Sequence, residues 1–131
     1  MVDRYADKSV VTAILVQQKE NMRALHNELS AEIAAISTRD ADKLTASASA
    51  KLTLLEKIQK KDKQLQSCTL AQLVTESADN AALVDEIKTL LGECQQQNEI
   101  NAHAAHQTSI AVGKVKDILL GANQVLTYGK K

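Results

Sequence analysis

The chain has no proline, phenylalanine or tryptophan, and only four glycines and two tyrosines among its 131 residues. Proline and glycine are the residues that most often end or bend a helix, so little in this sequence would interrupt one. The glycines stand alone at positions 92, 113, 121 and 129. Phosphate-binding loops of the usual kinds need closely spaced glycines, so these absences favour long helices and exclude such loops.

Neither sign of charge dominates, because Lys plus Arg and Asp plus Glu are both 16. Proteins that bind nucleic acid usually present a basic face. Polybasic segments likewise mark proteins that bind anionic membrane surfaces. We therefore expect no nucleic-acid partner and no electrostatic attachment to a membrane.

Long apolar runs are also missing. The stretch from Val10 to Val16 is short and is broken by Thr12, whereas about 18 consecutive apolar residues are needed to span a bilayer. The N-terminus does not have the pattern of a secretory signal. Cys68 and Cys94 form no Cys-x-x-Cys pair, which is typical of reduced thiols in a cytosolic protein. We predict a soluble, cytoplasmic protein without membrane insertion.

Alanine, by contrast, is abundant, with 19 residues, and it is the strongest helix former. Apolar residues recur at steps of three, four and seven in three segments, about residues 7–37, 40–66 and 80–120. Such steps place the apolar side chains on one face of a helix. We predict a single all-α domain over residues 1–131, an antiparallel helical hairpin or three-helix bundle with long, coiled-coil-like helices and a tail at residues 122–131.

Polar residues mark the expected helix boundaries. Thr38 or Asp40 can cap the second helix, and Asp79 or Asn80 can cap the third, because their side-chain oxygens accept bonds from free backbone N–H groups. Gly121 follows the third segment at a position suited to a helix C-cap. The third apolar stripe is longer than the first two helices can cover, so we expect its C-terminal end to overhang the bundle.

Three polar residues, Gln97, Asn101 and Thr108, interrupt the apolar stripe of the third segment. Buried amides in such a seam reduce stability and tend to fix register or partner. The alternative, which we favour, is that small neighbours such as Ala104 leave the seam shallow, so that the polar groups reach water. The burial of Asn98 and Asn101 stays open at this point.

No pattern of residues indicates a catalytic site. Glu99, His103 and His106 lie three and four residues apart on one helix face, where such groups can hold a metal ion. The chain has neither a Glu-x-x-His nor a His-Glu-x-x-His pattern. We predict no enzyme activity, no cofactor and no metal. A metal-binding helical protein that uses His103 and His106 remains an alternative, which metal analysis would decide.

Three elements of the sequence occur together in a known family: DADKLTASASAKLTLLEKIQK at 40–60, NEINA at 98–102 and LTYG at 126–129. In this order they resemble the FlgN-type flagellar export chaperones, and the resemblance covers nearly the whole chain. Lys51, Leu54 and Leu55 match the first element. Asn98 and Asn101 match an N-x-x-N-G pattern, in which Ala102 replaces the glycine of the family.

The resemblance implies a non-enzymatic, cytoplasmic chaperone. Such a protein binds the C-terminal helical region of hook–filament junction (hook-associated) proteins, prevents their premature assembly and delivers them to the cytoplasmic domain of the flagellar type III export gate. The resemblance also implies that Tyr128 docks on the export gate. Tyrosine is favoured as an interface anchor because its ring gives a large contact area at low entropic cost. The alternative is that Tyr128 folds back onto the bundle.

The expected overhang of the third helix predicts where the exported protein, the client, would bind. The apolar residues of that overhang and the tail are Val112, Val115, Ile118, Leu119, Val125 and Leu126. A helical or extended client segment lying along this stripe would complete the seam. A structural coiled coil or a sensor-bundle fragment that only associates into a homo-oligomer, without a client, remains an alternative.

Overall fold

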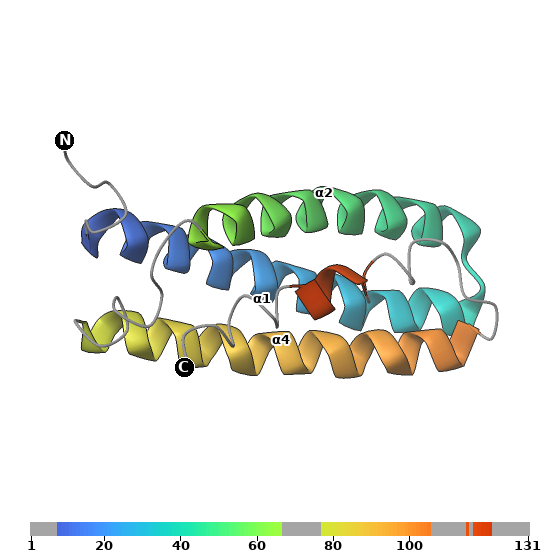
Figure 1. Ribbon diagram of the computed structural model, residues 1–131. Coiled ribbons are helices and arrows are strands. Elements are labelled where there is room, and N and C mark those ends of the chain that lie inside the picture. The colour runs from blue at the N-terminus through green and yellow to red at the C-terminus, as the bar shows by residue number, and fades with distance from the viewer. Residues whose placement is uncertain (1–7, 67–76, 106–114, 116, 122–131) are drawn as a thin grey trace.

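The computed structural model describes residues 8–66, 77–105, 115 and 117–121. Its three long helices are α1 (Lys8–Thr38), α2 (Ala41–Gln66) and α4 (Ala78–Ala105). Figure 1 shows α2 and α4 running along opposite sides of α1. Helix α1 packs against both, whereas α2 and α4 make few direct contacts within the described ranges. The predicted all-α architecture of a helical hairpin or bundle is confirmed.

A tight turn joins α1 to α2 and reverses the chain. Arg39 has a positive φ of 54°. The N–H of Arg39 donates to Ile36 O at 3.2 Å, and the N–H of Asp40 donates to Ala35 O at 3.1 Å. This pair of bonds is a Schellman motif, which satisfies the last carbonyls of α1 and places one residue in the left-handed conformation. Here that residue is an arginine rather than the usual glycine.

Both following helices begin with a side-chain cap. Asp40 caps α2, since its Oδ1 accepts the N–H of Lys43 at 3.1 Å, as we predicted for Thr38 or Asp40. Helix α4 begins earlier than predicted. Ser77 Oγ accepts the N–H of Asn80 at 3.2 Å, so Ser77 is the cap and the expectation of Asp79 or Asn80 is wrong. The serine hydroxyl is as effective a cap as an amide or carboxylate, and nothing in the local sequence separated the three.

The chain turns back after α4 instead of continuing as one helix to residue 120. Helix α4 ends at Ala105, and residues 117–121 are again helical. Gln95 Nε2 donates to Leu119 O at 3.5 Å, although the two residues are 24 positions apart. In an unbroken helix 24 residues would span about 36 Å. The overhanging third helix is therefore wrong; instead, residues 117–121, the red ribbon in Figure 1, lie against the bundle.

Packing explains this return. Val115, Ile118 and Leu119 are buried and belong to the core cluster of the bundle. Burying one such side chain is worth about 1.5–3 kcal/mol relative to leaving it in water. On an overhanging helix all three would stay exposed, so the folded-back arrangement is favoured.

Each long helix buries side chains at steps of three or four residues. On α1 these are Val11, Leu15, Gln18, Met22, Leu25, Leu29, Glu32 and Ala35. On α2 they are Ser47, Lys51, Leu55, Ile58, Asp62 and Leu65. On α4 they are Asn80, Val84, Ile87, Leu91, Cys94, Asn98 and Asn101. The buried faces are continuous only because they include polar and charged residues.

Candidate functional site

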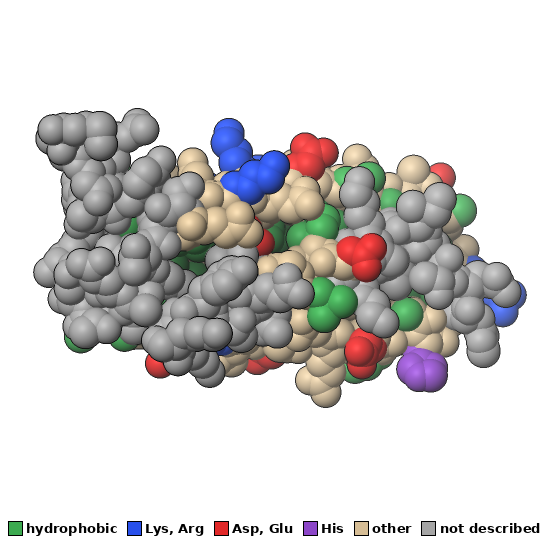
Figure 2. All heavy atoms as spheres, viewed as in Figure 1, with side chains coloured by type: hydrophobic (Ala, Val, Ile, Leu, Met, Phe, Trp, Pro, Cys, Tyr) green, Lys and Arg blue, Asp and Glu red, His purple; other side chains and the backbone are tan. Residues whose placement is uncertain are grey.

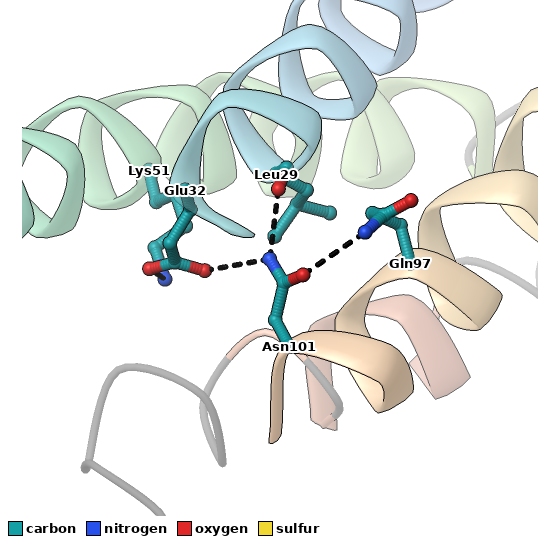
Figure 3. A network of polar contacts seen from close by, with 5 residues as sticks. All are labelled: Leu29, Glu32, Lys51, Gln97 and Asn101. Atoms are coloured by element: carbon teal, nitrogen blue, oxygen red, sulfur yellow. Dashed lines mark hydrogen bonds and ion pairs between the residues drawn. The ribbon is translucent and has the colours of Figure 1, made fainter. Parts of the chain in front are cut away.

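Four side chains and one backbone carbonyl form a polar network that joins all three long helices. Lys51 Nζ of α2 forms an ion pair with Glu32 Oε2 of α1. Asn101 Nδ2 of α4 donates to Glu32 Oε1 at 2.9 Å and to Leu29 O at 2.8 Å. Gln97 Nε2 donates to Asn101 Oδ1 at 3.0 Å. Figure 3 shows Asn101 pointing from α4 towards α1, with Lys51 beside Glu32.

Three of the four side chains in this network are buried, whereas Gln97 is partly exposed. The exposed fractions are 1% for Lys51, 6% for Glu32 and 0% for Asn101. Buried charges are tolerated when each has a partner of opposite sign and further hydrogen bonds. Glu32 meets both conditions, because one carboxylate oxygen faces the ammonium group of Lys51 and the other accepts from Asn101. The network therefore fixes α2 and α4 in register with α1.

The preferred interpretation of the polar seam on α4 is wrong for Asn101. We expected shallow packing that lets the amides reach water, but Asn101 is fully buried and bonded to α1. Asn98 is also buried, at 3% exposure, and its Oδ1 has no hydrogen-bond partner among the described residues. The structure agrees with the other interpretation, in which a buried amide specifies how helices align.

A second buried polar pair links α1 to α2 nearer the N-terminus of α1. Gln18 Nε2 donates to Asp62 Oδ1 at 2.8 Å and to Ile58 O at 3.1 Å. Burial raises the pKa of Asp62 to about 6, and the hydrogen bond from Gln18 partly opposes that shift. Asp62 looks like an interruption in the sequence pattern, yet in the structure it occupies a core position.

A groove opens between α1 and α2 close to the turn that joins them. Its volume is about 340 Å³. The lining residues are Glu28, Ala31, Glu32, Ala35, Lys43, Ala46, Ser47 and Ala50. Glu32 belongs both to this lining and to the polar network, so the groove and the network are adjacent.

Three of the residues predicted to bind a client lie in the core of the bundle. Val115 and Leu119 are 0% exposed and Ile118 is 8% exposed. The other three, Val112, Val125 and Leu126, lie outside the described residues, as does Tyr128. The segment around Val115 is therefore available to a partner only if it leaves its place against the bundle.

The remaining candidates for reactive chemistry are a metal site and the thiol of Cys94. Among the described residues, no three His, Cys, Asp or Glu side chains are close enough together to hold a metal ion; His106 is not among them. Cys94 is buried, and its Sγ lies 3.4 Å from Met22 O. Burial raises the pKa of the Cys94 thiol to about 12, with a smaller contribution from Glu93, so it is a packed thiol and a poor nucleophile.

The described part of the chain is an all-α protein of three long helices joined by a buried polar network. Comparison with protein families then matches residues 7–131 to the FlgN protein family. The chain therefore belongs to the FlgN family of flagellar export chaperones. Comparisons with curated proteins and with solved structures find no significant match. Within the described ranges, no helix has the length and apolar character needed to cross a membrane.

Two of the three elements that suggested this family meet inside the molecule, and the third, at 126–129, lies outside the described residues. Lys51 comes from the element at 40–60, and Asn101 comes from the element at 98–102. Both bind the carboxylate of Glu32. The sequence elements were visible in advance, but the role of Glu32 was not, because a single glutamate on a helix carries no local signal of burial.

Proposed function

We propose that this protein is a cytoplasmic export chaperone for hook-associated proteins of the flagellum. It binds the C-terminal helical region of these clients, prevents their premature assembly and delivers them to the cytoplasmic domain of the flagellar type III export gate. The observation that supports this proposal best is the match of residues 7–131 to the FlgN family. It uses no cofactor or metal and catalyses no reaction.

Client binding involves the C-terminal segment in this proposal. Val115, Ile118 and Leu119 would exchange their contacts in the core for contacts with an apolar face of the client helix. Val112, Val125 and Leu126 would extend that surface. The proposal is supported by the composition of the segment, because its apolar residues are large enough to anchor a helix. Among the described residues, a long hydrogen bond of 3.5 Å from Gln95 Nε2 to Leu119 O ties the segment to α4.

Docking on the export gate involves Tyr128. A tyrosine near the end of the chain supplies an apolar ring and a hydroxyl group for a directed hydrogen bond. Because Tyr5 is the only other aromatic residue, the chain offers a matched control for any effect of losing one ring.

The test is a calorimetric titration of the protein with the purified C-terminal helical segment of a hook-associated protein, and separately with the cytoplasmic domain of the export gate. Truncation after Gly121 should abolish client binding while leaving helicity intact. Tyr128→Ala should weaken gate binding, whereas Tyr5→Ala should not.

The outcomes separate the two parts of the proposal. Full client binding by the truncated protein would place the client site elsewhere, and equal effects of the two tyrosine changes would remove Tyr128 from the gate site. If wild-type protein binds no client segment and its helicity rises with concentration, the self-associating coiled coil is the better description.

A further inference from the structure

The groove between α1 and α2 is lined with small side chains on both walls. Four alanines line it, Ala31 and Ala35 from α1 and Ala46 and Ala50 from α2. On each helix the lining positions follow the steps i, i+3, i+4 and i+7, which is one continuous helix face about 10 Å long. Two such faces side by side leave room for the backbone of a third helix to approach closely.

A serine in this groove is buried without a partner. Ser47 is 5% exposed, and its Oγ has no hydrogen-bond partner in the described part of the chain. A buried hydroxyl without a partner is unfavourable, because it has lost its hydrogen bonds to water without replacing them. Ser47 lines the groove, so a polar group entering it would find a hydrogen-bonding atom that the protein itself leaves unused.

The two walls of the groove carry side chains of opposite charge. Glu28 lies on the α1 side and Lys43 on the α2 side. Neither takes part in an ion pair among the described residues. Beside them, the buried pair of Glu32 and Lys51 holds the two walls together, so the groove is a preformed surface.

On the face drawn in Figure 2, the described residues form no broad apolar patch that would indicate where a partner binds. There the described hydrophobic side chains reach the surface only as small areas between polar and charged ones. The α1–α2 groove, in contrast, combines small side chains, an unused hydroxyl and two charges of opposite sign that form no ion pair among the described residues.

We propose that the α1–α2 groove is a second docking site for the client, and that it holds about two turns of a client helix. Small residues of that helix face the four alanines, and a polar side chain bonds to Ser47 Oγ. A cationic residue of the helix lies towards Glu28 and an anionic residue towards Lys43. This inference rests on the proposed function, since it takes the exported protein as the occupant.

The test compares two alanines of α1 that are both exposed. Ala31 lines the groove and Ala34 does not. Ala31→Leu would fill the groove, so we expect it to weaken binding of the client's C-terminal helical segment at least ten-fold in calorimetry. Ala34→Leu, the matched control, should bind like wild type, and thermal melts should show both variants folded.

A charge change tests the orientation of the helix. Lys43→Glu should weaken client binding at least three-fold at low salt, and the effect should shrink at high salt because exposed charges are screened. Lys60→Glu, on an exposed part of α2 away from the groove, is the control. Equal effects of the two changes would overturn the assignment of Lys43.

Two results would overturn the proposal while leaving the proposed function intact. One is wild-type client binding that Ala31→Leu does not change. The other is a dimer, seen by sedimentation, that Ala31→Leu dissociates without changing client binding, because the groove would then hold a second copy. If wild-type protein binds no client segment at all, the proposed function fails, and this proposal fails with it.

Discussion

Asn101 Nδ2 lies 2.9 Å from Glu32 Oε1, which joins two residues that are 69 positions apart in the chain. The same amide nitrogen donates to Leu29 O one turn earlier on α1. Because both acceptors are buried, a shift of α4 along α1 by one turn would leave a carbonyl and a carboxylate without their donor. The pair therefore fixes the alignment of the two helices.

Replacing Asn101 should destabilise the protein strongly. Asn101→Ala removes the donor of both bonds and leaves Leu29 O and Glu32 partly unsatisfied in the core. We expect a loss of about 2–4 kcal/mol in the free energy of unfolding, measured by urea denaturation. Gln96→Ala, at an exposed position of α4, should change stability by less than about 0.5 kcal/mol. Similar values for the two variants would contradict the network.

Replacing only one partner of the ion pair between Lys51 and Glu32 should destabilise the protein more than replacing both partners. Lys51→Met leaves the carboxylate of Glu32 buried without its counter-charge, at an expected cost of about 3–5 kcal/mol. The double variant Lys51→Met with Glu32→Gln keeps an oxygen for Asn101 and should recover at least half of that loss. Lys19→Met, which breaks the exposed pair with Glu86, should cost about 1 kcal/mol or less.

Asp62→Asn should stabilise the protein at neutral pH. Burial raises the pKa of Asp62 from 3.8 to about 6, so the folded state binds the proton more tightly than the unfolded state. Stability therefore falls as the pH rises from about 4 to 6, and the full cost, roughly 2–3 kcal/mol, persists above pH 6. The variant should exceed wild type at pH 7.5 by about that amount and match it near pH 3.5. Asp85→Asn controls for the loss of one exposed negative charge.

Cys94 should resist alkylation in the native protein. With a pKa of about 12, only about one thiol in ten thousand is ionised at pH 8, and the thiolate is the reactive form. We expect iodoacetamide to modify Cys94 at least 100-fold more slowly in buffer than in urea, followed by mass spectrometry of the peptide. Modification at equal rates would mean that α4 separates from α1 frequently under native conditions.

Gly92→Ala should stabilise α4. Gly92 lies in the middle of the helix at an exposed position, and a Cβ built there meets nothing within 4 Å. Alanine is favoured over glycine inside a helix by roughly 0.5–1 kcal/mol. A small rise in the urea midpoint should follow, without an effect on client binding. A loss of stability would show that the surface around Gly92 is covered by another part of the chain.

Apolar periodicity predicted the helices of the hairpin. It failed where the buried residue is polar. A stripe drawn through apolar residues alone would include Leu52, which is 37% exposed, and would omit Lys51, which is 1% exposed. The burial of Lys51 depends on Glu32, and the burial of Asp62 depends on Gln18. Each polar residue looks like a surface residue until its partner on another helix is known.

The end of the third helix could not be predicted for a related reason. The stripe continues through Val115 and Ile118 at helical spacing, and Gly113 alone does not require a helix to stop. The end of the helix is decided by burial of these side chains in the core of the bundle, a tertiary effect that local spacing does not reveal. The groove was equally hidden, because the alanines that line it look like ordinary helix formers.

The central position of α1 has a consequence during synthesis. Residues 8–66, which include both helices of the α1–α2 hairpin, leave the ribosome first, but the other side of α1 is covered only after residues 78–105 have been made. At roughly 5–20 residues per second, this interval lasts a few seconds. Each newly made copy therefore exposes its own apolar seam to other polypeptides before α4 arrives, so the nascent chain itself passes through an aggregation-prone stage.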